Sequence, residues 1–81
     1  MNDGRIEIEV TFTGWDSIPR REIIKLWAIP RIGEYVALHY TNKDGVRDRY
    51  EGKVVSILHE VHGTKTFMPN LRLAGVGILQ A

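Results

Sequence analysis

The sequence predicts an all-β fold, a small antiparallel five-stranded barrel, and three local patterns carry this prediction. Apolar and polar residues alternate through residues 5–12, as they do in a half-buried strand. Pro30 and Gly33 form a turn that runs into a second alternating stretch, residues 35–40, because proline fixes φ and glycine accepts unusual values. An Asp44-Gly45 pair then marks a hairpin turn.

The size and composition of the chain bound its class. A chain of 81 residues makes one small domain, residues 1–81, with a modest core. Eleven Lys and Arg residues against ten Asp and Glu leave a net charge of +1, which gives no general attraction to nucleic acid or to an anionic membrane. The absence of cysteine excludes disulfides, thiolate metal sites and cysteine nucleophiles. With no signal-peptide pattern and no apolar run near the roughly 20 residues of a membrane span, we expect a cytoplasmic protein without a membrane partner.

Residues 18–26 fit two local structures. Ser17 is a suitable N-cap for one short helical turn, whereas the alternation through residues 19–27 also fits a strand. The β-branched pair Ile23-Ile24 favours the strand, and a helix shorter than about 10 residues is marginal without tertiary support. We therefore predict a strand and keep the helical turn as the alternative.

The second half of the chain supplies the remaining strands. Gly52 lies inside a predicted strand over residues 47–59 and indicates a bend or bulge, and the strand beyond it is apolar on both faces, as in the middle of a sheet. Residues 65–79 are broken at Pro69, and a bulge near Ala74-Gly75 would bring Leu71, Leu73, Val76 and Ile78 to one side. The predicted core consists of Ile6, Ile8, Val10, Val36, Leu38, Val55, Ile57 and Leu71.

Two stretches, Ile-Gly-Glu-Tyr-Val-Ala-Leu at residues 32–38 and Tyr-Glu-Gly-Lys-Val-Val-Ser-Ile at residues 50–57, resemble small Src homology 3-like barrels of the Tudor and KOW kind. The resemblance implies a binding module for protein, peptide or nucleic acid, of a kind also found among small bacterial and phage proteins. A Tudor module would need an aromatic cage, here Tyr40 and Tyr50 closed by Trp15. Tyr40 shares its parity with Val36 and Leu38, which directs it to the core instead.

Catalytic and metal-binding patterns are weak. His59, Glu60 and His62, with His39 across the sheet, form the best metal candidate, but a regular strand turns His59 and His62 to opposite faces. Neither serine has a readable partnership with a histidine and an acid, and no phosphate-binding loop is present. We therefore predict a protein that is not an enzyme and needs neither metal nor cofactor.

The candidate binding residues are aromatic and basic. Trp15 lies in a polar loop, and Trp27 adjoins the Pro30 turn. Arg47, Arg49 and Lys53 share one face of a strand and form a basic stripe, which Arg20, Arg21 and Arg31 in neighbouring segments extend. Asp48 and Glu51 interleave with these cations, which favours a solvated face over a phosphate-binding one.

These observations predict a non-catalytic interaction module. The favoured partner is a protein or peptide bound through Trp15, Trp27 and the Pro30 turn. A nucleic acid bound by Arg31, Arg47, Arg49 and Lys53 is the first alternative. A structural or assembly subunit with an edge-pairing interface is the second.

Overall fold

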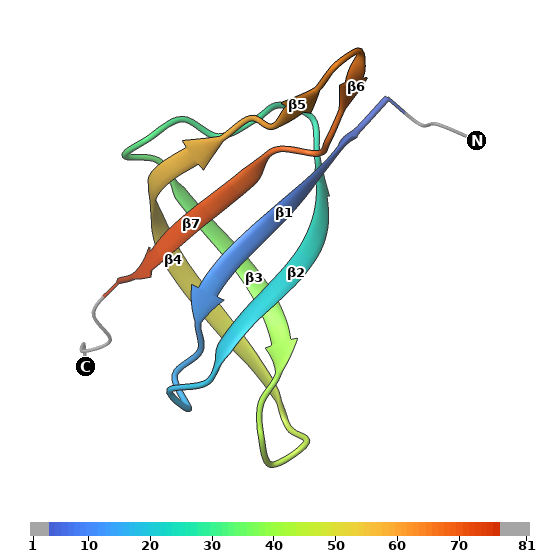
Figure 1. The fold of residues 1–81 in the computed structure, drawn as a ribbon. Coiled ribbons are helices and arrows are strands. Elements are labelled where there is room, and N and C mark those ends of the chain that lie inside the picture. Colours follow the sequence, from blue (N-terminus) through green and yellow to red (C-terminus); the bar gives the residue numbers. More distant parts are fainter. Residues whose placement is uncertain (1–3, 77–81) are drawn as a thin grey trace.

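Five strands form one strongly curled sheet, a half-barrel, in the computed structural model, which describes residues 4–76 (Figure 1). They are β1 (Ile6–Thr13), β2 (Pro19–Leu26), β3 (Tyr35–Thr41), β4 (Arg47–Leu58) and β7 (Asn70–Gly75). A separate small hairpin of β5 (Val61–His62) and β6 (Lys65–Thr66) lies between β4 and β7 in the chain. The described residues include no helix, and so none that is long and apolar enough to cross a membrane.

The strand order is β2-β1-β7-β4-β3, and it confirms the all-β class while correcting the antiparallel prediction. Three neighbouring pairs are antiparallel, but β1 and β7 run parallel, with Val10 opposite Leu71. A parallel pair needs a long crossover. Here all the chain between β1 and β7 serves as that crossover, and the sheet is mixed.

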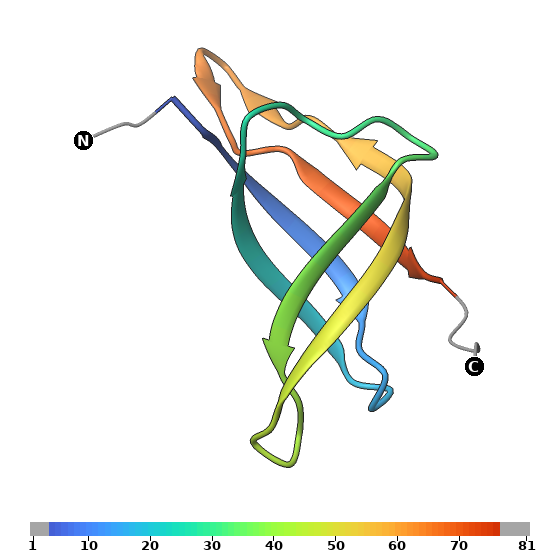
Figure 2. The ribbon, with the colours of Figure 1, turned by 180° about the vertical axis from the view of Figure 1, so that it is seen from behind.

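The ends of the sheet are β2 and β3. Seen from behind, residues 27–34 cross from the end of β2 to the start of β3 along the upper rim of the half-barrel (Figure 2). The turn before β3 has the predicted conformation, since Gly33 has a φ of 95° and its N–H donates to the Val54 carbonyl. Residues 19–26 form the predicted strand, so the alternative of a helical turn is wrong.

The concave face of the sheet holds the core. Three aromatic rings pack at its lower end, with Phe12 5.5 Å from Tyr40 and 4.5 Å from Tyr50 between ring centroids. Aliphatic side chains fill the rest. The buried apolar residues are Ile8, Val10, Phe12, Val36, Leu38, Tyr40, Tyr50, Val54, Leu71 and Leu73.

One bulge overturns part of the predicted core. The pairing of β4 with β7 shifts between Val54 and Ser56, so Val55 is the extra residue and is 44% exposed while Val54 is fully buried. The prediction of a buried Val55 is therefore wrong. A bulge near residues 74–75 is also wrong, because β7 pairs in register there. Val76 is partly buried, and residue 78 lies outside the described residues.

Two other residues of the predicted core are not fully buried. Ile6 is 37% exposed because it begins β1, and Ile57 is only partly buried against the core. Gly52 serves a close approach rather than a bend, since a Cβ there would lie 2.9 Å from both the Leu73 Cβ and the Tyr50 ring.

The bulge makes a testable contrast between adjacent valines. Val54→Ala should lower the free energy of unfolding by about 1–3 kcal/mol because it leaves a cavity in the core. Val55→Ala should change it by less than about 0.5 kcal/mol because that side chain is exposed. Urea denaturation of the two variants measures both values. Equal losses would contradict the bulge.

Candidate functional site

The loop between β1 and β2 is fixed to β3 and β4 through Trp15. The backbone N–H of Trp15 donates to the Tyr40 hydroxyl at 2.9 Å, and its indole Nε1 donates to the Arg49 carbonyl at 2.8 Å. The ring lies 4.6 Å from that of Tyr50. Trp15 keeps 39% of its surface exposed, but its donors are used inside the fold. Tyr40 and Tyr50 are themselves buried, so these three residues make an internal cluster rather than an open cage.

Asp16 and Arg20 form a bidentate ion pair beside this cluster. Both nitrogen–oxygen distances are 2.7 Å, and the side chains are only 8% and 14% exposed. The Arg20 guanidinium carbon lies 4.5 Å from the centroid of the Tyr40 ring, and Asp16 also accepts the Lys43 backbone N–H at 2.9 Å. We call Trp15, Asp16, Arg20 and Tyr40 the clasp, because they join β2 and its loop to β3 and the residues that follow it.

The clasp shifts the titration of its charged groups. The hydrogen bonds from Arg20 lower the pKa of Asp16 well below its ordinary value, against the effect of desolvation and helped by the backbone N–H groups of Ile18 and Lys43. The same pair raises the pKa of Arg20. The sequence predicts that Arg20 extends the basic stripe. The structure corrects this, because the Arg20 charge is paired.

The basic stripe exists as a row on the outer face of β4. Arg47, Arg49 and Lys53 are all exposed, opposite Thr41, His39 and Tyr35 of β3. Arg49 makes an ion pair with Glu51 at 3.2 Å. Arg31 lies before β3 and is 86% exposed at its side chain, where it pairs with Glu34 at 3.3 Å. The three cations of β4 thus share one face, and both Arg49 and Arg31 are partly neutralised by a glutamate.

Trp27 lies at the other end of β2 from Trp15. It is 73% exposed in the loop after β2, and the Arg5 guanidinium lies 5.7 Å from its ring centroid. At about 3.3 Å per residue, the eight residues of β2 extend roughly 25 Å. The two tryptophans therefore do not share one small site.

The two edge strands differ in chemistry. β2 has the sequence Pro-Arg-Arg-Glu-Ile-Ile-Lys-Leu, and proline and charges are the usual protection of a sheet edge. β3 has the sequence Tyr-Val-Ala-Leu-His-Tyr-Thr, without proline, Asp, Glu, Lys or Arg. Within residues 4–76 β3 pairs with β4 alone, so alternate N–H and C=O groups along its outer edge lack a strand partner. No pattern in the sequence indicates which strands end the sheet.

The histidines do not form a metal centre in the described part of the chain. His59 follows β4 and His62 ends β5, and both are exposed. Residues 4–76 contain no group of three His, Asp or Glu side chains placed to hold a metal ion.

Comparison with known proteins does not assign the chain to a family. No protein-family model, curated protein or solved structure matches the chain. The resemblance of residues 32–57 to Src homology 3-like barrels therefore stays a resemblance.

Replacing Asp16 with asparagine should flatten the loss of stability in acid. The folded-state pKa of Asp16 is depressed, so its charge stabilises the fold fully above the unfolded pKa of about 4, and this contribution disappears as the pH falls through the folded pKa. The difference in unfolding free energy between the wild-type protein and Asp16→Asn should therefore shrink from about pH 5 to about pH 2. Denaturant titrations across this range measure it, and a constant difference would show that the charge is not the cause.

Proposed function

We propose that the protein is a non-catalytic, cytoplasmic binding module that adds an extended polypeptide segment to the outer edge of β3. The single observation that supports this most is the uncharged, unpaired edge of β3 within the described residues. Such an edge is a template for one more strand, and main-chain hydrogen bonds then supply much of the affinity.

The contrast with β2 favours one edge over the other. β2 carries four charged residues and begins with Pro19, whereas β3 carries none of these protections. Exposed side chains on β3, including Tyr35 at 59%, would lie beside alternate side chains of an added strand. These neighbours would provide selectivity for the sequence of the segment.

The charge pattern favours a polypeptide over a nucleic acid as the partner. Phosphate binding depends on several uncompensated cations. Arg49 is paired with Glu51 and Arg31 with Glu34, and the net charge is only +1. The exposed row of Arg47, Arg49 and Lys53 keeps nucleic acid as the second candidate function. The resemblance to Src homology 3-like barrels suits either binding role.

Peptide binding to the outer edge of β3 can be tested in two steps. Twelve-residue peptides displayed on phage are first selected for binding, and the tightest one is then synthesised and titrated into the protein by nuclear magnetic resonance. We expect the largest amide shifts in β3. Ala37→Lys puts a charge on this edge strand and should weaken binding about tenfold, because charge blocks strand addition. Ile23→Lys is the matched control on the exposed face of β2 and should have little effect.

Two results would count against this function. Equal affinity of both lysine variants would show that β3 is not the binding edge. Tight binding of a generic oligonucleotide at physiological salt, lost when Arg47, Arg49 and Lys53 are all replaced, would favour the nucleic-acid role.

A further inference from the structure

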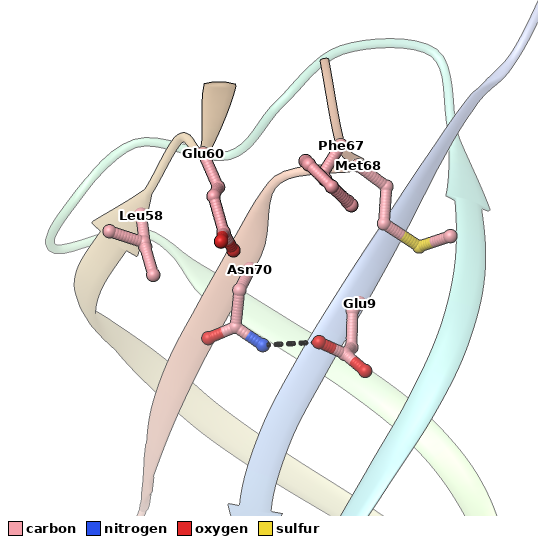
Figure 3. A pocket seen from close by; sticks show the side chains of 6 residues that line it. All are labelled: Glu9, Leu58, Glu60, Phe67, Met68 and Asn70. Atoms are coloured by element: carbon pink, nitrogen blue, oxygen red, sulfur yellow. Dashed lines mark hydrogen bonds between the residues drawn. The ribbon is translucent and has the colours of Figure 1, made fainter. Parts of the chain in front are cut away.

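A groove of about 250 Å³ lies on the outer face, where β1 and β7 meet the end of β4 and the chain around the β5–β6 hairpin (Figure 3). Leu58, Phe67 and Met68 form its apolar walls, and Glu9, Glu60 and Asn70 supply its polar groups. Its volume is below the roughly 300–1,000 Å³ of small-molecule sites. One side chain of a partner suits it better than a cofactor does.

The polar side chains of the groove present acceptors. The Asn70 amide nitrogen donates to the Glu9 Oε1 at 2.9 Å and to the Thr11 Oγ1 at 3.0 Å, which uses both of its hydrogens. The amide oxygen of Asn70 and the second oxygen of Glu9 remain as acceptors. Among the described residues Glu60 makes no side-chain hydrogen bond or ion pair, and Figure 3 shows its carboxylate directed toward Asn70.

Lys65, which adjoins the groove, does not neutralise its carboxylates. The Lys65 ammonium lies 5.6 Å from the centroid of the Phe67 ring and forms no ion pair with either groove carboxylate in the described structure. Ca²⁺ takes about 6–8 oxygen ligands, more than the groove presents, and no group of three His, Asp or Glu side chains placed to hold a metal ion exists within residues 4–76. A ligand that complements the groove brings a positive charge, several donors and an apolar stem.

We propose that this groove binds the side chain of an arginine on a partner polypeptide. A guanidinium has five donors in a planar fork, so it can reach acceptors on Glu9, Glu60 and Asn70 while its flat face and methylene stem pack on the apolar walls. A lysine ammonium has three donors around one point and matches separated acceptors less well. In the strand order β4 and β7 separate β1 from β3, so this site is distinct from the β3 edge. Either proposal can hold without the other.

Titration of the full-length, isotope-labelled protein with N-acetyl-arginine methylamide tests the groove. Shifts should concentrate at residues 58–60 and 67–70, and N-acetyl-citrulline methylamide, which has the same shape without the charge, should leave them unchanged. Glu60→Gln and Glu9→Gln should each weaken binding by up to about fivefold, the range of one exposed ion pair. Asp44→Asn removes the same charge at the β3–β4 turn and should bind like the wild-type protein.

Several outcomes would overturn the assignment. They are equal shifts with the citrulline compound, equal or tighter binding of the matching lysine compound, and a loss with Asp44→Asn as large as with Glu60→Gln. Calcium chloride that moves the same amides at lower concentration would make the groove a metal site instead. Glu60 is exposed, so Glu60→Gln keeps the test decisive even if Glu9→Gln unfolds. If the groove does not bind the arginine compound, the amide shifts that a selected peptide causes in β3 are still expected, so the two proposals fail separately.

Discussion

The bidentate ion pair of Asp16 and Arg20 is the interaction on which the shape of the half-barrel depends. The strand order leaves β2 and β3 at opposite ends of the sheet, and Arg20 of β2 reaches across to the ring of Tyr40 of β3. Asp16 accepts the Lys43 N–H beyond β3, which ties the same loop to the β3–β4 hairpin. Side chains thus hold the ends of the sheet together at the lower rim. Within residues 4–76, no strand pairs with the outer edge of β2 or of β3.

Local patterns predicted the strands because their causes are local. Alternation placed β1 and β3, and Gly33 and Gly45 have the positive φ values that their turns require. The parallel pairing of β1 with β7 joins residues about sixty positions apart, and no local signal encodes it. The bulge was hidden because Val54 and Val55 are equally apolar, so parity alone could not say which one faces the core.

In the candidate site, too, local features could be predicted from the sequence and long-range contacts could not. Exposure of Arg47, Arg49 and Lys53 followed from their parity on one strand. The role of Trp15 did not, because its partners Tyr40 and Arg49 lie 25 and 34 positions away. The shifted carboxyl groups have structural causes: the pKa of Glu34 is lowered by the Arg31 backbone N–H, as that of Asp16 is by Arg20. The groove at Glu9 and Glu60 was missed because it joins three stretches that are distant in the sequence, at residue 9, residues 58–60 and residues 67–70.

Native-state amide hydrogen exchange of β3 tests the open edge most directly. If β3 pairs with β4 alone, protection should alternate along Tyr35–Thr41, with amides that point to β4 slow and those that point away close to the rate of an unprotected chain. Slow exchange of every amide in β3, together with those on the outer edge of β2, would show a continuous ladder between the two strands. That result would contradict both the open half-barrel and the binding edge.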